Sequence, residues 1–320
     1  MRLIRGLHNL RSEPLLASVA TIGNYDGVHR GHQAVLTSLV EEGRLRKLPV
    51  VVVVFEPTPA EFFAAEKAPS RLNRLVDKLP VLALCGVDYV VCLRFNEALA
   101  QTEPEAFAQK LLADSLGVKH LVIGDDFRFG KDRSGDYALL EKVGAASGFT
   151  VASHPTVAMA DERISSTRIR ELLTAGECGQ AAALLGQPFR VSGRVAHGDK
   201  LGRQLSFPTA NIPLRRVRSP VNGVFVVTVE GLVENGVRLE PHRAIANVGH
   251  RPTVNGIGDR LEVHLLDFSG DLYGQRLTVS FLAKLREEQK FESVDALKAQ
   301  ISADVEQARS WFINHDPRSD

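Results

Sequence analysis

The chain has 320 residues, of which 44% are apolar, and its 39 Lys and Arg residues are nearly matched by 38 Asp and Glu residues. A chain of this length usually forms more than one hydrophobic core, so two domains are expected. The formal charge of +1 does not indicate a polyanion-binding surface, and no apolar run is long enough to span a bilayer or resembles a signal segment. We therefore expect a cytoplasmic protein whose partners include neither nucleic acid nor a membrane.

The cysteines do not indicate a metal or redox site. Cys85, Cys92 and Cys178 are an odd set without CxxC spacing, which argues against zinc and against a disulfide framework. Two of them lie among Leu, Val and Ala, where small apolar residues pack. Buried thiols are the expectation.

The first half of the chain alternates short β-branched runs with amphipathic segments. The runs predicted as strands are 19–23, 50–55, 89–93, 120–124 and 149–152. The segments predicted as helices are 33–42, 71–85, 104–116 and 137–147. Parallel strands need crossover connections, and these are usually right-handed helices. The alternation therefore predicts a doubly wound, Rossmann-like α/β domain with helices on both faces of a parallel sheet.

A change of pattern follows this domain. Ser165 to Thr167 is a helix-start signal for a helix over 168–174, and a second, Ala-rich helix is predicted at 180–185. Beyond Phe189 the period becomes two, which predicts antiparallel strands at 189–195, 223–229, 244–248, 260–266 and 277–283. We place the boundary near Gly186 to Pro188, which gives domains 1–186 and 187–315.

The second domain is predicted to be a small antiparallel β-barrel followed by a helix. Asn235-Gly236 is a typical hairpin turn between two of its segments. The last helix is predicted over 293–311, and its apolar side is expected to consist of Val294, Leu297, Ile301 and Val305.

The segment Gly23 to His32 (GNYDGVHRGH) connects the first strand of the parallel sheet to a helix. Gly27 and Gly31 would let the backbone approach a ligand, and the helix N-terminus offers free N–H groups. His29 and His32 are three residues apart and can face one phosphate group, although such a pair can also simply cap a helix. The glycines, and the position at the end of a parallel strand, favour a triphosphate site.

A second glycine-rich segment opens the barrel domain. The residues from Gly193 to Arg203 (GRVAHGDKLGR) precede FPTAN at 207–211. Backbone N–H groups of such a loop can wrap phosphates, and the Thr209 hydroxyl and Asn211 carbonyl are hard oxygen ligands of the kind that Mg²⁺ takes. The segment therefore predicts a Mg-ATP clamp. Its candidate nucleotide-binding residues are Gly193, Gly198, Gly202 and Arg203.

A carboxylate lies in one of the predicted barrel strands. Within LEVHLLD at 261–267, alternation places Glu262 and His264 on one face and the apolar residues on the other. This pattern alone would predict a solvated Glu262.

From about Ile4 to Arg309 the sequence resembles the bacterial bifunctional riboflavin kinase and FMN adenylyltransferase family, also called FAD synthetase. In the first half the resemblance is carried by GNYDGVHRGH, by FEPTP at 55–59, by GDDFRFG at 124–130 with Gly135, and by RISSTRIR at 163–170. In the second half it is carried by the segments 207–211, 223–225, 247–253, 261–267, 273–274 and 281–291. Thr58 departs from a common His of the family, and Ser206 departs from a common Gly.

The resemblance implies an enzyme that phosphorylates riboflavin to FMN in a C-terminal six-stranded barrel. It also implies adenylylation of FMN to FAD, with release of pyrophosphate, in the N-terminal domain. ATP and Mg²⁺ would serve both steps, and FMN and FAD would be product or substrate.

The resemblance also implies roles for individual residues. Those at the N-terminal nucleotide site would be His29, His32, Gly23, Tyr25, Asp26, Gly27, Gly31, Arg163, Ser166, Thr167 and Arg168. Those that hold flavin would be Phe55, Pro57, Pro59, Asp126, Phe127 and, on a flap of the barrel domain, Arg286. Glu262 would be the catalytic base, because the ribityl hydroxyl of riboflavin is neutral and must lose a proton, whereas the phosphate of FMN is already anionic.

Two alternatives stay open. Only one of the two activities could be retained, or the chain could be a flavin-binding regulator of transcription. The second alternative is disfavoured because no helix-turn-helix pattern or basic stretch is present. Self-association is left open.

Overall fold

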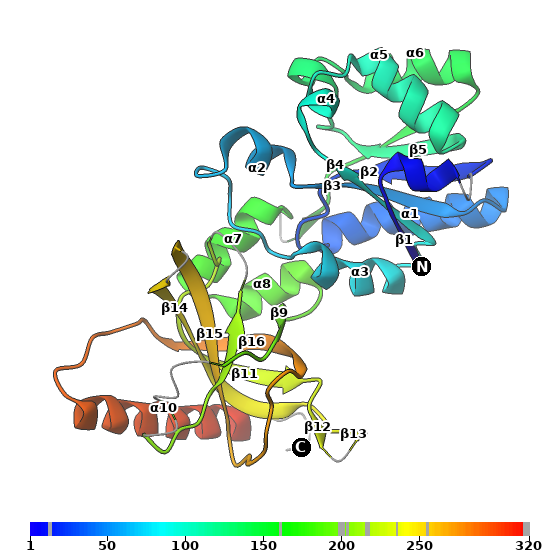
Figure 1. The fold of residues 1–320 in the computed structure, drawn as a ribbon. Helices are drawn as coiled ribbons and strands as arrows, with labels where there is room; N and C mark the ends of the chain where they lie inside the picture. Colours follow the sequence, from blue (N-terminus) through cyan, green and yellow to red (C-terminus); the bar gives the residue numbers. More distant parts are fainter. Residues whose placement is uncertain are drawn as a thin grey trace. The chain divides into compact units, whose positions relative to one another are not determined.

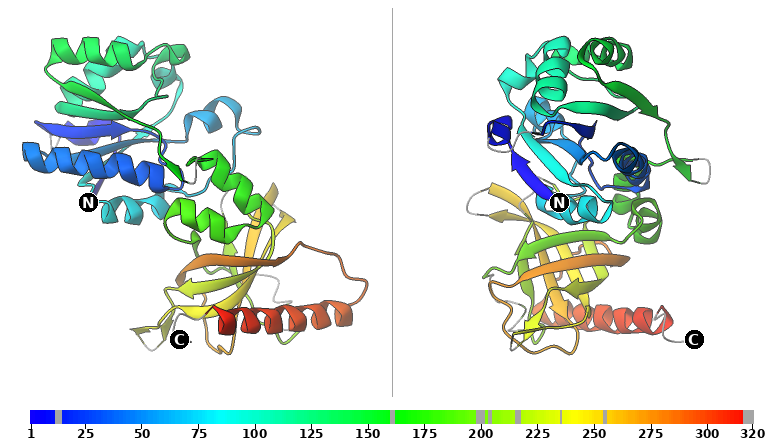
Figure 2. Two further views of the ribbon diagram at one scale, coloured as in Figure 1. Left: turned by 180° about the vertical axis from the view of Figure 1, so that it is seen from behind. Right: turned by 90° about the vertical axis from the view of Figure 1, so that its right-hand side faces the viewer.

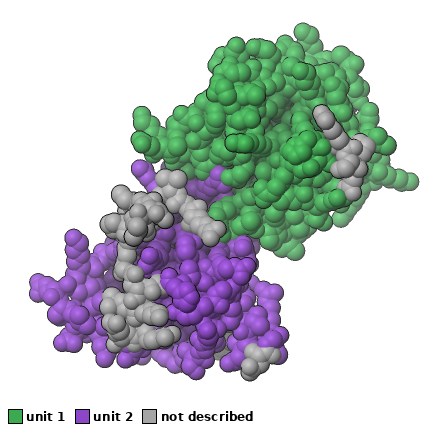
Figure 3. Space-filling view, viewed as in Figure 1, with its two compact units in different colours: residues 1–69, 74–165 green, residues 70–73, 166–320 purple. Residues whose placement is uncertain are grey.

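The computed structural model describes residues 1–11, 15–159, 162–197, 202, 205–214, 218–234, 236–253 and 256–315, with the backbone alone at 250–253 and 256–258. By their internal contacts the residues form two compact units (Figure 3). Unit 1 consists of Met1–Pro69 and Arg74–Ser165, and unit 2 consists of Ser70–Asn73 and Ser166–Asp320.

Unit 1 contains a six-stranded parallel sheet with the order β1-β4-β3-β2-β5-β6. Its strands are β1 (Arg2–Arg5), β2 (Ser18–Ile22), β3 (Val50–Glu56), β4 (Tyr89–Arg94), β5 (Val118–Gly124) and β6 (Thr150–His154). The predicted strands are confirmed. β1 was not predicted, because it is a short edge strand whose only buried residue is Ile4, so the sequence shows no alternation there.

Helices cover both faces of this sheet (Figures 1 and 2). The helices of unit 1 are α1 (Arg30–Arg46), α2 (Pro59–Ala64), α3 (Leu75–Leu84), α4 (Glu97–Ala100), α5 (Pro104–Phe107) and α6 (Tyr137–Ser147). Of these, α2 buries no residue and is not part of the cover. The shorter elements are the 3-10 turns Leu7–Arg11 and Lys131–Arg133, a π-helical continuation of α5 over Ala108–Ser115, and the hairpin β7 (Ala158–Met159) and β8 (Glu162–Arg163).

β3 shows why the strands of this sheet have continuous apolar sequences. Val51 and Val53 are buried in the core that contains α5 and α6, whereas Val52 and Val54 are buried in the core that contains α1 and α3. Such two-sided burial is typical of a parallel sheet inside a doubly wound domain. The predicted fold of the first half is therefore confirmed.

The strand order contains a switch point between β2 and β5. β3 and β4 lie on one side of β2, and β5 and β6 lie on the other side. Successive strands are therefore added in opposite directions from β2, and ligands of such sheets bind outside the carboxyl ends of the strands at this point. The segments that begin at Gly23 and Gly124 follow these two strands.

Unit 2 contains a six-stranded antiparallel sheet with the order β10-β15-β14-β11-β16-β9. Its strands are β9 (Phe189–Arg194), β10 (Ala210–Pro213), β11 (Gly223–Glu230), β14 (His242–Thr253), β15 (Gly256–Leu265) and β16 (Arg276–Arg286). A bridge between Ala196 and Asn211 joins the two outer strands, so the sheet is a nearly closed barrel. The predicted barrel is confirmed, and β10 is an addition to the prediction.

A small hairpin of β12 (Val233–Glu234) and β13 (Val237–Arg238) surrounds the predicted turn. Asn235 itself lies outside the described residues, and Gly236 has a φ of 78°, which suits a hairpin turn.

Two helices from before the predicted boundary share the hydrophobic core of the barrel. Leu173 of α7 (Ser166–Ala175) and Leu185 of α8 (Cys178–Leu185) belong to the same buried cluster as Phe225, Val263 and Phe281 of the strands. By packing, α7 and α8 are therefore part of unit 2. The domain boundary between residues 186 and 187 stays a prediction.

The outer face of the barrel is covered by α10 (Val294–Asn314), which the Ser293 hydroxyl caps by accepting a hydrogen bond of 3.1 Å from the Ala296 backbone N–H. Val305 and Phe312 of α10 pack on Val226 and Ile245 of the strands. Val294 was expected on the apolar side of the helix, but this prediction is wrong. Its side chain is 62% exposed, because the first turn of α10 extends beyond the strands (Figures 1 and 2).

The thiols of the described chain are free, with Cys92 and Cys178 buried and Cys85 half-buried. Burial raises the pKa of Cys178 to about 11, so its thiol is inert at neutral pH. No helix among the described residues is both long and apolar enough to cross a membrane.

Candidate functional sites

The loop after β2 has an unusual backbone. Tyr25, Gly27 and Val28 have φ values of 48°, 87° and 42°. A β-branched residue such as Val28 rarely adopts a positive φ, and such strain is typical of functional loops. The Gln33 side-chain amide holds the loop by donating a hydrogen bond of 2.8 Å to the Val28 carbonyl.

His29 and His32 form one compact pair at the start of α1. His29 is the N-cap residue, and its Nδ1 accepts a hydrogen bond of 3.3 Å from the His32 backbone N–H. The two rings are stacked with centroids 3.7 Å apart. A Cβ at position 31 would come within 3.2 Å of the His29 ring, so a larger residue there would press against that ring. The capping arrangement considered from the sequence is present, and it fixes the ring of His29 beside that of His32.

His32 is a neutral donor rather than a cation. Its pKa is held well below 6.5, first by burial and then by the nearby His29 and Lys78. Its Nδ1 is buried and has no partner among the described residues. A neutral imidazole donates one hydrogen bond and accepts one. At pH 7 this side chain can therefore position a phosphate oxygen, but it does not neutralise charge.

A buried lysine lies next to the same loop. Lys78 of α3 is 5% exposed, and its Nζ donates a hydrogen bond of 2.6 Å to the Asn24 carbonyl. The sequence interpretation missed this residue, although a signal was present. Lys78 lies between Leu75 and Leu82 at the spacing of an apolar helix face, and a charge at such a position is rarely accidental.

The loop after β5 contributes charged and aromatic side chains. Arg163 and Asp126 form an ion pair of 2.6 Å, but their side chains are 57% and 67% exposed, so the pair adds little stability. Phe127 stacks on Phe129 with ring centroids 5.6 Å apart. The structure thus pairs a residue predicted for the nucleotide with one predicted for flavin, and both roles stay predictions.

An aromatic cluster follows β3. Phe55 and Phe62 each contact Phe95 edge to face, at 5.8 and 5.3 Å between ring centroids. Phe63 also contacts Phe95, at 5.7 Å, and is 67% exposed. Only Phe55 of this cluster, together with Pro57 and Pro59 of the same loop, was predicted from the sequence.

Thr58, which departs from the family pattern, has a structural role. It caps α2, which carries Phe62 and Phe63, in a reciprocal arrangement with Glu61. Such a capping box orders the first turn of a helix. Thr58, in place of His, therefore supports the helix that carries the exposed ring of Phe63.

The other residues predicted for the nucleotide site lie in the loop after β2 or at the start of α7. Tyr25 is buried with its hydroxyl 2.8 Å from the Thr21 hydroxyl, and Gly23 packs against its ring. Ser166, Thr167 and Arg168 begin α7 in unit 2. The contacts of Ser166, Thr167 and Arg168 with the nucleotide stay predictions, as do those of Tyr25 and Asp26.

In unit 2 the polar residues lie in one row across the barrel strands. The strand registers pair Asn211 with Glu262, Glu262 with Asn247, Asn247 with Val224, and Val224 with Arg286. The alternation predicted for Glu262 is confirmed. Leu261 and Val263 are buried inside the barrel, whereas Glu262 lies on the outer face that α10 covers.

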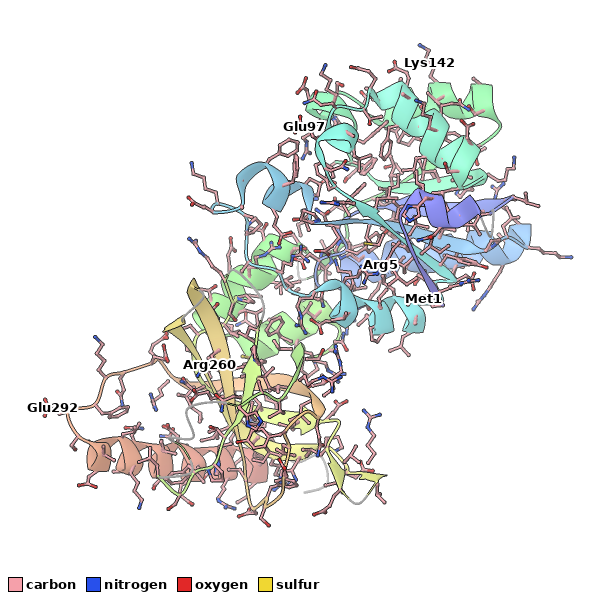
Figure 4. The ribbon with its side chains drawn as sticks, viewed as in Figure 1. Met1, Arg5, Glu97, Lys142, Arg260 and Glu292 are labelled. Carbon is pink, nitrogen blue, oxygen red and sulfur yellow. The ribbon has the colours of Figure 1, made fainter. Side chains whose placement is uncertain are left out.

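A cavity of about 280 Å³ lies over this row. Its floor includes Asn211, Glu262, Asn247, Val224 and Arg286, and its other walls include Leu297 and Ile301 of α10 and Phe291 of the preceding loop. Glu292, which Figure 4 labels, follows Phe291 at the outer turn of this loop. A chain segment between a strand and a helix thus forms one wall of the cavity.

Arg286 is held by a buried carboxylate of α10. Its Nε and Nη2 donate hydrogen bonds of 2.9 and 2.7 Å to Asp304, which also accepts 2.9 Å from the Gln300 amide. The Asp304 side chain is 2% exposed. The sequence interpretation missed Asp304, although an acidic residue between Ile301 and Val305 on the helix face toward the barrel was visible.

Thr209 and Asn211 are suitable ligands for Mg²⁺. Asn211 is 9% exposed, and its Oδ1 has no partner among the described residues. Hard oxygen donors of this kind suit Mg²⁺. The described residues contain no cluster of three or more His, Cys, Asp and Glu side chains that could hold a metal ion.

The glycine-rich segment before these residues is described in part. Gly198 and Arg203 lie outside the described residues. Gly202 packs tightly, because a Cβ there would clash with the Phe207 carbonyl oxygen, and a Cβ on Gly193 would clash with the Ile212 side chain. Ser206, where the family often has glycine, has a φ of 69°. Glycine would adopt this backbone at lower cost.

Comparisons with known proteins agree with this arrangement. The family described as FAD synthetase matches residues 12–168, and the family described as riboflavin kinase matches residues 185–312. The bifunctional riboflavin kinase/FMN adenylyltransferase of Escherichia coli strain K12 is 53% identical over 312 residues, which are 98% of each chain. The corresponding protein of Pseudomonas fluorescens is 51% identical over 311 residues, or 97% of each chain.

A solved structure has the same fold. A protein of Streptococcus pneumoniae described as a macrolide-efflux protein matches with a TM-score of 0.79 and 31% identity. The match covers 97% of this chain and 99% of that one.

Proposed function

This chain belongs to the family of bifunctional riboflavin kinases and FMN adenylyltransferases, and from this premise we propose a role for each of the two sites. The chain carries an FAD synthetase domain and a riboflavin kinase domain, so its reactions are the phosphorylation of riboflavin by ATP and the adenylylation of FMN to FAD. We assign the first reaction to the cavity over the barrel and the second to the loops at the carboxyl edge of the parallel sheet.

In the barrel site Glu262 accepts the proton of the ribityl hydroxyl as the oxygen attacks the γ-phosphorus of ATP, and ADP leaves as the bond from that phosphorus to the bridging oxygen breaks. A neutral alcohol is a poor nucleophile, so a positioned base lowers the barrier. Thr209 and Asn211 would hold Mg²⁺, which neutralises charge on the transferred phosphoryl group. Gly193, Gly198, Gly202 and Arg203 belong to the segment assigned to ATP.

Arg286 contributes a fixed positive charge to the same cavity. Its two hydrogen bonds to Asp304 fix the plane of the guanidinium group. A planar cation of this kind can stack on an aromatic ring or donate to an oxygen. We assign it to the bound flavin.

In the unit 1 site no base is required, because the attacking phosphate oxygen of FMN is already anionic. The barrier lies in crowding negative charge around the α-phosphorus of ATP, so donors and charge must be in place beforehand. His29 and neutral His32 supply donors at the N-terminus of α1, and Lys78 supplies a nearby positive charge. Pyrophosphate then leaves.

Further residues of the proposed domain 1–186 are assigned to FMN adenylylation. Arg163, Ser166, Thr167 and Arg168 are assigned to the phosphates of ATP. Phe55, Pro57, Pro59, Asp126 and Phe127 are assigned to the flavin of FMN. The exposed ring of Phe63, which contacts Phe95 as Phe55 does, supports this, since a flat aromatic ligand can stack on such a surface. We place the two domains at 1–186 and 187–315, and the enzyme in the cytoplasm, without nucleic acid or membrane among its partners.

The observation that carries the kinase assignment is the carboxylate of Glu262 between two amide side chains, facing a cavity that contains a fixed arginine. Purified protein incubated with riboflavin, ATP and Mg²⁺ should yield FAD, with FMN as an intermediate, when the products are separated by chromatography. FMN without FAD would limit the activity to the barrel site. Flavin binding without any product would support the regulatory alternative. Reactions without Mg²⁺ test the metal assignment.

A further inference from the structure

Asn247 is a polar residue of the barrel cavity that has no assigned role. It lies on β14 directly opposite Glu262 of β15, on the same face of the sheet. Its amide Nδ2 donates a hydrogen bond of 3.3 Å to Glu288, in the loop that closes the cavity. This bond fixes the orientation of the amide group. Asn247 and Glu288 both line the cavity.

The amide oxygen of Asn247 is buried and has no partner among the described residues. A buried acceptor that is left unpaired costs free energy, and native proteins rarely keep one without a reason. The oxygen of Asn211 is in the same state, on the other side of Glu262 in the same row. The carboxylate is therefore flanked by two unpaired acceptors in a cavity that holds ligands.

The chemistry of the ligands decides what can pair with these oxygens. Phosphate oxygens of ATP are acceptors at neutral pH and cannot pair with another acceptor. A cation, or a ligand group that carries an O–H or N–H, can pair with them. Asn211 lies two residues from Thr209, which makes a cation site with two oxygen donors. Asn247 has Glu262 and Glu288 as its polar neighbours in the cavity, and a polyol chain brings hydroxyl donors to them.

We propose that Asn247 binds the alcohol substrate by accepting a hydrogen bond from a secondary hydroxyl of the ribityl chain. Paired side chains of neighbouring strands are about 5 Å apart, and a sugar alcohol carries a hydroxyl on each successive carbon. Asn247 therefore holds one hydroxyl while Glu262 faces the terminal hydroxyl that attacks phosphorus. This proposal rests on the proposed kinase function and adds a residue that selects a polyol.

The proposal predicts how the enzyme treats substrates that lack one hydroxyl. Asn247→Ala should lower kcat/KM for riboflavin by about tenfold, chiefly through KM, because one hydrogen bond of ordinary strength is lost. The KM for ATP and the Mg²⁺ concentration for half-maximal rate should not change. Asn247→Ser, which keeps a polar side chain, serves as a second variant should the alanine variant fail to fold.

The test is a cycle of variants and substrates. Wild-type and variant proteins are assayed with riboflavin and with riboflavins that each lack one secondary ribityl hydroxyl. One of these analogues should be about tenfold poorer for the wild type and no poorer than riboflavin for the Asn247 variants. Equal losses with every analogue would overturn the proposal. So would a change confined to the Mg²⁺ dependence, which would make Asn247 a cation ligand.

Two controls separate this inference from the function on which it rests. Conversion of supplied FMN to FAD should be unchanged in every variant, because that reaction is assigned to unit 1. The fluorescence of Trp311, the single tryptophan, reports whether α10 is still packed on the barrel. If the wild type makes no FMN, the proposed function fails. If the wild type makes FMN and the variants behave like it with every substrate, only the role of Asn247 fails.

Discussion

The two proposed sites of this chain are built in different ways. In unit 1 the site consists of loops at the carboxyl ends of parallel strands, and it depends on backbone that few residues adopt, as at Val28. In unit 2 the site is a row of side chains set by strand register, with Glu262 in the row and α10 as cover. The difference matches the chemistry. Transfer to an anionic phosphate needs donors placed around charge, whereas transfer to an alcohol needs a base at one fixed point.

The largest effect is expected from removing the donor pair of unit 1. His29→Ala combined with His32→Ala should lower FAD formation from FMN by roughly a thousandfold or more, because two donors to the crowded phosphates are lost. FMN formation from riboflavin should persist. Since His29 also caps α1, the control is His29→Asn with His32→Gln, which keeps a good N-cap residue and an N–H donor. Equal loss of both activities would contradict separate sites.

The next largest effect should come from the buried ion pair of unit 2. Asp304→Ala leaves the Arg286 guanidinium without its buried partner, which should cost about 3–5 kcal/mol of unfolding free energy. Denaturant unfolding followed by Trp311 fluorescence measures this. Arg309→Ala is the matched control, because it removes an exposed ion pair with Asp267 from the same helix and should change the transition little. Similar shifts for both variants would show that α10 is held by packing alone.

Glu262→Gln should lower the activity of the barrel site alone, by a smaller factor. It keeps the shape of the side chain but cannot accept the proton, so FMN formation should fall by about a hundredfold or more. Supplied FMN should still become FAD at the wild-type rate. A kinase rate within a few-fold of wild type would mean that the hydroxyl loses its proton elsewhere.

The smallest effect concerns pH and should separate the stabilities of the units. Burial keeps the pKa of His32 and of His120 below 6.5 in folded unit 1. As the pH falls below about 6.5, these histidines take up protons in the unfolded chain but not in the folded unit. The stability present above that pH is therefore progressively lost. The loss is at most about 1.4 kcal/mol per pH unit for each histidine. Thermal unfolding by circular dichroism at pH 7.5 and 5.5 measures this loss.

The Trp311 transition of unit 2 is the reference for that experiment. Replacing His120 with glutamine should remove the part of the stability loss that is due to His120. The part that is due to His32 should remain. A unit 1 transition that is unaffected between the two pH values would contradict the buried, neutral state of His32.

What the sequence could predict follows from the range of the interactions. Strands such as β3 and the loop before α1 are encoded by neighbouring residues, and their patterns predicted both the fold and the region of each site. The partnership of Arg286 with Asp304, and of Asn247 with Glu262, depends on strand register and helix docking between distant segments. The residue before a helix can be read as a cap, but the stacking of His29 on His32 needs the folded loop.

One earlier observation limits how the chain can be divided. Residues 70–73 belong to unit 2, although both flanking segments belong to unit 1, and Leu72 is fully buried with Ile169 of α7. In a fragment that ends at residue 186, α7 and α8 would lack the barrel core against which Leu173 and Leu185 pack. A kinase fragment that starts at residue 187 would expose the other side of the same apolar surface. During synthesis, Leu72 leaves the ribosome well before α7 exists, so its burial must come late. The chain therefore enters unit 2 at residues 70–73 and returns to unit 1, so no single cut separates the two units.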